Sequence, residues 1–196
     1  MAGTVKKGTE LATIDVVCVS VRPAGTEDEL ILNTANQIQV TTATETQDKV
    51  PLIVKGVLIA QKPQVTTVTG NTLVITDNVF NPELVQILQG GIIKYDNSEP
   101  KKVVGYTPPV VGSSDKGKVF DLMAYSAIYD AAGLIQGYER ITYPNCQGVP
   151  VAFNSQDGAF RAPSYTINSA PNNGQAPYDI DIVKTLPTVT AAAASS

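Results

Sequence analysis

The stretch QIQVTT at residues 37–42 alternates polar and apolar side chains without a break. Such alternation is typical of a β-strand that turns one face toward a core, because successive side chains point to opposite sides of the strand. One face takes Ile38, Val40 and Thr42, and the other takes Gln37, Gln39 and Thr41. The stretch therefore predicts a strand with one apolar face and one hydrogen-bonding, uncharged face.

The residues that follow predict a partner for this strand. Residues 43–49 are polar and lack Gly and Pro, and residues 51–61 return with many aliphatic side chains, Leu52 and Val54 among them. This pattern favours a long hairpin over 37–61. Its loose tip is expected at residues 44–49, which include Thr44, Glu45, Asp48 and Lys49. We expect the hairpin to project from the body.

Three further turns predict hairpins. Gly70-Asn71 between residues 65–69 and 72–76 fits a two-residue type II′ turn. Residues 130–133, DAAG, fit a type I turn with a glycine bulge between strands 119–129 and 134–143. Asp157-Gly158 fits a type I′ turn that joins strands 149–154 and 159–169. Further strands are expected at 14–21, 92–95, 103–111 and 178–184.

One helix is expected, beginning after Asn81. Asn81 can cap free backbone N–H groups, Pro82 suits the first helical position, Glu83 suits the positive end of the helix dipole, and Gly90 can end the helix. The sequence therefore predicts a mainly β fold: an antiparallel β-sandwich or barrel with one short flanking α-helix and long projecting hairpins. We expect a single domain over residues 1–186 and a flexible C-terminal tail over 187–196.

Composition limits the chemistry. The chain of 196 residues has no His, no Trp and two Cys, and its formal net charge is −4. An acidic chain lacks the basic surface of a nucleic-acid binder. Without His, the usual catalytic triads and most zinc and haem sites have no key residue. We therefore expect no enzyme activity, no catalytic residues, no cofactor and no metal.

The remaining features have plain structural interpretations. Cys18 and Cys146 are expected as free, buried thiols, because residues 1–10 do not resemble an export signal. The acidic run at residues 27–29 is interpreted as a solvated turn and not a cation site. No run of 18 apolar residues occurs, so no membrane insertion is expected.

Motifs in the last two thirds of the chain recur in order in a known family. They are DNVFNPE at 77–83, the glycine pair at 90–91, GY at 105–106 with PP at 108–109, YD at 129–130, GY at 137–138, YPNCQG at 143–148, DGAF at 157–160, PSYTI at 163–167 and APY at 176–178. On these residues the chain, over 72–187, resembles the major tail tube proteins of tailed bacteriophages and of related phage-derived particles.

The resemblance implies a structural virion protein that is made in the host cytoplasm and self-assembles into stacked hexameric rings. The rings form the tail tube, a conduit for DNA delivery into the host through which DNA passes without specific binding. Implied partners are further copies of the chain, a tail tip or baseplate initiator, a tape measure protein in the lumen and a tail terminator. Because each copy is acidic, a ring carries a large negative charge.

The hairpin suits self-assembly, with its polar face toward the lumen and its tip toward the adjacent ring. Its assigned residues are Gln37, Ile38, Gln39, Val40, Thr41, Thr44, Glu45, Asp48, Lys49, Leu52 and Val54. Ile38→Asp is expected to abolish rings while the monomer stays folded. Alternatives are the tube of a DNA-free phage-derived particle, an unrelated β-sandwich surface or adhesion protein, and a small-ligand barrel.

Overall fold

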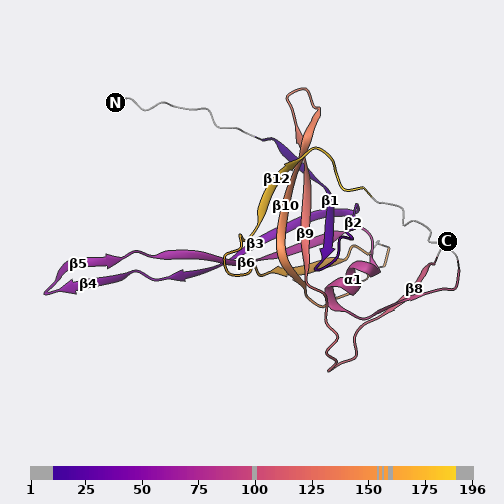
Figure 1. Cartoon of the computed structure of the whole chain (residues 1–196), viewed down its shortest axis with the longest axis horizontal. Helices are drawn as coiled ribbons and strands as arrows, with labels where there is room; N and C mark the ends of the chain where they lie inside the picture. Colours follow the sequence, from indigo (N-terminus) through magenta and orange to yellow (C-terminus); the bar gives the residue numbers. More distant parts are fainter. Residues whose placement is uncertain (1–10, 99–100, 154, 156, 159–160, 189–196) are drawn as a thin grey trace.

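The computed structural model describes residues 11–98, 101–153, 155, 157–158 and 161–188 (Figure 1). Most of the expected C-terminal tail, residues 189–196, lies outside them. The elements are β1 (Thr13–Pro23), β2 (Leu30–Leu32), β3 (Ala35–Gln47), β4 (Val50–Val54), β5 (Val57–Lys62), β6 (Val65–Asp77), α1 (Pro82–Gln89), β7 (Ile92–Tyr95), β8 (Val103–Thr107), β9 (Phe120–Tyr129), β10 (Ile135–Gly148), β11 (Ser164–Ser169) and β12 (Asp179–Val183). The predicted mainly β class with one short helix is confirmed.

An eight-stranded antiparallel sheet forms the body. Its strand order is β2-β1-β9-β10-β11-β6-β3, and β12 pairs with β10 off this path. Two small sheets, β4-β5 and β7-β8, stand apart from it. The large sheet curls so that its two halves pack against a shared core, but it does not close into a barrel. The arrangement is sandwich-like.

The core forms where alternating residues of both halves of the sheet meet. The helix α1 adds its apolar face to the same cluster through Leu84, Val85 and Leu88. The inward side chains of the strands are Val19 and Val21 of β1, Leu73 and Ile75 of β6, Phe120 and Leu122 of β9, and Tyr165 and Ile167 of β11. Burial of these apolar side chains is the main driving force for the fold.

The helix has the ends that the sequence predicts. The Asn81 side chain accepts a hydrogen bond from the backbone N–H of Leu84 at 3.0 Å. Pro82 is the first helical residue, and Gly90 ends the helix with a φ of 82°. A residue with a side chain would be strained at that φ. Capping of this kind typically contributes about 1 kcal/mol.

The β9–β10 hairpin is confirmed and projects from the body (Figure 1). Its turn is held by Asp130, whose carboxylate accepts the backbone N–H groups of Leu134 and Ala132 at 2.9 Å each. The hydrogen bond from Leu134 is the main cause of a lowered pKa at Asp130. Gly133 supplies the positive φ of 78° that the turn requires.

Two hairpin predictions are wrong. Gly70-Asn71 makes no turn, because β6 continues through it as one strand and pairs with both β3 and β11. The glycine is needed there for close packing: a Cβ on Gly70 would lie 2.5 Å from the carbonyl oxygen of Ser169. Asp157-Gly158 does form a turn, but residues 149–153 are not a strand. β11 pairs instead with the end of β10, through pairs such as Gln147 with Asn168, and on its other side with β6.

Both cysteines are free and buried, as predicted. Cys18 lies on the outer side of the sheet with Met123 and Tyr125, where Val183 and Leu186 of the C-terminal segment pack over them. Burial, together with the charge of Glu29, raises the pKa of Cys18 to about 11. Burial also raises the pKa of Cys146 to about 12. Both thiols are therefore protonated at neutral pH.

Candidate assembly site

A long two-stranded arm extends from the body (Figure 1). It consists of the outer halves of β3 and β6 and, beyond them, the β4–β5 hairpin. β3 pairs with β6 along its whole length, from Ala35 opposite Asp77 to Gln47 opposite Val65. A bulge on β6 between the pairs Ala43–Gly70 and Thr44–Val68 marks the place where the strands leave the sheet. Bulges bend and twist a ribbon, so this one sets the direction of the arm.

The predicted hairpin over 37–61 is wrong in its pairing and in its tip, although residues 37–61 do extend from the body as part of an arm (Figure 1). The partner of β3 is β6 and not residues 51–61. Thr44 and Glu45 lie inside β3, and Asp48 and Lys49 join β3 to β4. The chain reverses at Lys55-Gly56, where φ is 50° and 81°. Two successive positive φ values are typical of a type I′ turn, which matches the twist of two strands, whereas residues 44–49 contain no glycine to form one.

The end of the arm exposes a contiguous group of aliphatic side chains. Between 48% and 61% of each is accessible, and they are Val50, Leu52, Ile53, Val54, Val57, Leu58 and Ile59. We call this group the arm tip. A two-stranded ribbon without a third layer is marginally stable in water, and exposed apolar patches mark interaction surfaces. The arm tip is therefore a candidate interaction surface.

Polar contacts along the arm are few and exposed. The hydroxyls of Thr46 and Thr66 lie 3.1 Å apart, and Lys62 Nζ donates to Gln47 Oε1 at 3.3 Å. Exposed contacts of this kind add little stability, because both groups are well solvated when apart. Main-chain hydrogen bonds between β3 and β6 therefore hold the two strands of the arm together more than these side-chain contacts do.

The predicted alternation in β3 is confirmed near the body. Ile38 is half-buried and packs against the core, whereas Gln37, Gln39 and Thr41 are exposed on the opposite side. Val40 shares the core side with Ile38 but lies closer to the arm and is 39% exposed. Ile38→Asp would therefore disturb the body as well as any assembly, so it does not isolate the assembly step.

The exposed side of β3 continues across its neighbours as one surface, which we call the polar face. It alternates with the buried side chains of the same strands and follows the register of β3, β6 and β11. Its members are Gln37, Gln39, Thr41, Thr72, Val74, Thr76, Ser164, Thr166 and Asn168. Within it, the Thr72 hydroxyl donates to Asn168 Oδ1 at 3.1 Å. The polar face presents hydroxyl and amide groups side by side.

The outer edge of β3 pairs with no other strand of the described residues. β3 ends the order of the large sheet and pairs there with β6, and its 13 residues include no Pro, Lys or Arg. Natural edge strands are usually short, bulged, charged or covered, because their free N–H and C=O groups pair with other chains. A long free edge whose one charged residue is Glu45, beside an apolar arm tip, is suited to β-pairing between copies.

The sequence does not indicate several residues of this site. It predicts a separate hairpin for the outer half of β6, and it indicates a polar face on β3 alone. A signal for the true arm was present in Lys55-Gly56, a glycine turn flanked on both sides by aliphatic residues. The 13-residue lengths of β3 and β6 followed only from their mutual pairing.

Other surfaces offer less chemistry. A cavity of about 460 Å³ lies between the end of α1 and residues 108–117. Asp115 on its wall accepts the N–H of Gly91 at 3.0 Å, and so holds this segment against the helix. Across the described ranges no cluster of His, Cys, Asp or Glu could hold a metal ion. None of the helices described there has the length and apolar character to cross a bilayer.

Comparison with known proteins gives limited similarity. No protein-family model and no curated protein matches the sequence. Among solved structures, the chain aligns with a chain from the cryo-EM structure of the anti-feeding prophage (AFP) baseplate, 6-fold symmetrised. The alignment covers 93% of this chain and 98% of that chain, with 10% sequence identity and a TM-score of 0.35.

Proposed function

We propose that this chain is a structural subunit that self-assembles into stacked hexameric rings and forms the tail tube of a bacteriophage or of a phage-derived particle. The observation that carries the proposal is the arm, where the free edge of β3 runs into an exposed aliphatic tip. The number of copies in a ring and the stacking of rings into a tube are inferred from the resemblance of residues 72–187 to tail tube proteins. We propose no catalytic role.

In this proposal the two parts of the arm have different partners. The β3 edge pairs with a neighbouring copy through main-chain hydrogen bonds. This contact joins two different surfaces, so repeating it closes a ring when the rotation between neighbouring copies is a whole fraction of a full turn. The arm tip reaches a copy in the adjacent ring and buries its aliphatic side chains there. The polar face then turns toward the lumen, and the core lies behind it.

The further partners follow from this role. A tail tip or baseplate initiator would template the first ring, a tape measure protein would occupy the lumen during growth, and a terminator would close the end. DNA would pass through the lumen without specific binding, and the location would be the virion tail. In a DNA-free particle the same tube would carry no DNA.

Negative-stain electron microscopy of the full chain over a range of concentrations, together with its mass in solution, tests the proposal. Six-fold rings or open-ended tubes are the expected result. A protein that stays monomeric at its highest attainable concentration, and after seeding with a tail tip complex, would overturn it. That result would favour a β-sandwich surface or adhesion protein.

A further inference from the structure

The polar face lacks fixed charge over its whole extent. No Lys, Arg, Asp or Glu occurs in residues 30–44, 63–76 or 162–178, which include all of β11, the body half of β3 and the body half of β6 up to its last residue, the buried Asp77. Along β3 the first charged residue is Glu45, which lies past the bulge and in the arm. The gap in charge therefore coincides with the part of the sheet that belongs to the body.

Burial does not account for this absence on β3 or at either end of β11, although Thr72, Val74, Thr76 and Thr166 between them are half-buried. The buried side chains of these strands, such as Leu73 and Tyr165, lie on the opposite side of the sheet. Gln37, Gln39 and Thr41 are exposed, and an exposed sheet face accommodates charged side chains at little cost. The polar face nevertheless offers only hydroxyl, amide and one aliphatic side chain toward solvent.

Resting on the proposed tube, we propose that its lumen wall is indifferent to the sign of a solute's charge. Lysines on a wall would hold a polyanion by releasing its counterions, and carboxylates would repel it. Hydroxyl and amide groups do neither, because they exchange their hydrogen bonds with water. The wall passes cations and anions at similar rates, so it does not restrict the cargo to one charge class.

The reaction rates of a cysteine on the polar face report the electrostatic potential at the lumen wall. Thr41→Cys places a thiol there, while the native Cys18 and Cys146 thiols are buried and do not compete. In assembled tubes the thiol reacts separately with a cationic and with an anionic methanethiosulfonate reagent, and the ratio of the two rates is measured. Dividing this ratio by the same ratio for a free small thiol corrects for the intrinsic reactivities of the two reagents. We expect a corrected ratio within about threefold of one and nearly independent of salt, because the polar face itself carries no charge to be screened and the next charged residue of β3, Glu45, lies four residues from Thr41.

A matched variant calibrates the measurement. Gln39→Glu in the Thr41→Cys background adds a carboxylate two residues away, at the neighbouring position on the same face of β3. It should shift the ratio about tenfold toward the cationic reagent, and added salt should reverse the shift. Thr166→Cys on β11 repeats the measurement if the first cysteine impairs assembly.

Two controls separate this inference from the proposed function. A bulky polymer-linked maleimide should label the cysteine in monomers but not in tubes. If it labels tubes equally fast, the polar face does not line the lumen, so the inference is overturned while the proposed tube stands. If neither the unsubstituted chain nor either cysteine variant forms tubes, the proposed function is wrong and the inference falls with it. If tubes exclude the bulky reagent yet the small reagents differ by about tenfold in a salt-sensitive way, the inference alone is overturned. The same ratio of reaction rates, measured on the folded monomer, reports the electrostatic potential at the polar face without the tube.

Discussion

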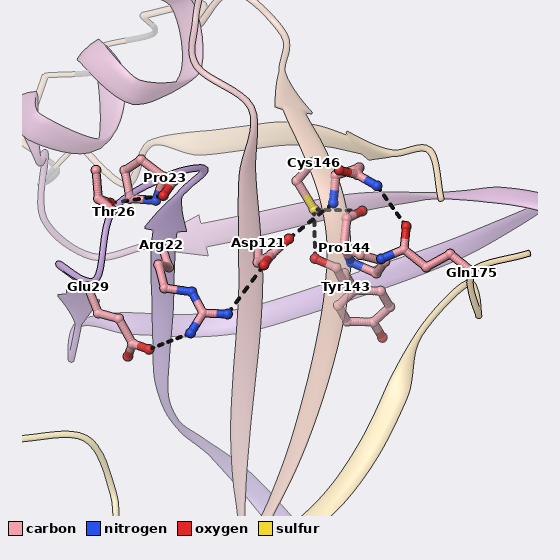
Figure 2. A network of polar contacts seen from close by, with 10 residues as sticks. Arg22, Pro23, Thr26, Glu29, Asp121, Tyr143, Pro144, Cys146 and Gln175 are labelled. Atoms are coloured by element: carbon pink, nitrogen blue, oxygen red, sulfur yellow. Dashed lines mark hydrogen bonds and ion pairs between the residues drawn. The ribbon is translucent and has the colours of Figure 1, made fainter. Parts of the chain in front are cut away.

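The Asp121 carboxylate accepts a hydrogen bond from the backbone N–H of Asn145 at 3.2 Å, where β10 bulges away from β9. Asn145 has a φ of 50°, which is uncommon for a residue with a side chain. Figure 2 shows Asp121 between Arg22 of β1 and this bulge. The residues just after the bulge, up to Gly148, pair with β11. The contact therefore helps to hold the strand that adjoins the polar face.

Replacing Asp121 should weaken the fold. Asp121→Ala removes the acceptor for the Asn145 N–H and leaves a strained backbone unsupported, so we expect a loss of about 1–3 kcal/mol in the free energy of unfolding. Urea denaturation measures it. Glu29→Ala is the matched control, since Glu29 contacts the same Arg22 at 3.9 Å in a half-buried ion pair but accepts no hydrogen bond from the Asn145 N–H. Equal losses in both variants would contradict the role given to the Asn145 contact.

Gly148 cannot be replaced without moving the helix. A Cβ on Gly148 would lie 2.5 Å from both Cα and Cβ of Leu88, which belongs to the core. Overpacking of this kind costs about 1–3 kcal/mol, so Gly148→Ala should lower Tm by several degrees. Gly105→Ala is the control, because its Cβ would meet only the Lys94 side chain at 3.7 Å. Equal Tm values for the two variants would show that α1 shifts freely.

Alkaline pH should destabilise the protein through its thiols. In the unfolded chain Cys18 and Cys146 lose their protons near pH 9, but burial holds them protonated in the folded chain up to about 11 and 12. The unfolded state thus binds fewer protons above pH 9, so stability falls from pH 9 upward and is unaffected by the thiols below it. Urea denaturation across this range measures the fall.

A double variant separates the thiols from other groups. Burial also raises the pKa of Tyr143 and Tyr165, which therefore act in the same direction. Cys18→Ala with Cys146→Ala should keep the tyrosine part of the decline and lose the rest. Rapid reaction of the native thiols with Ellman's reagent at neutral pH would contradict their burial.

The arm tip should matter to assembly and not to folding. Ile53 is 59% exposed, so Ile53→Asp should change the free energy of unfolding by less than about 0.5 kcal/mol. In a tube the new carboxylate would be buried without a partner, so the concentration needed for assembly should rise about tenfold or more. Sedimentation of tubes measures that concentration. Ile53→Val keeps the apolar contact and should assemble normally, and tubes of Ile53→Asp at an unchanged concentration would exclude the tip from the contact.

The local elements were the most predictable part of the structure. Asn81, Pro82 and Gly90 define the ends of α1 because capping depends on a few neighbouring residues. The turn at residues 130–133 was predictable for the same reason, since Asp130 and Gly133 complete it alone. Alternation in residues 37–42 correctly separated the core side of β3 from its exposed side.

Pairing over long distances decided the rest. Gly70 was predicted as a turn residue, but its role is to let the backbone of Ser169 approach, which only the partner strand reveals. The tip of the arm lies at Lys55-Gly56 because β3 pairs with β6 and not with the aliphatic residues 51–61, which are nearer in the sequence. Sequence alone determined the helix, the β class and the two faces of β3, since these depend on neighbours along the chain. Tertiary structure decided the arm, the free edge and the breadth of the polar face, because strand register is set by packing between distant residues.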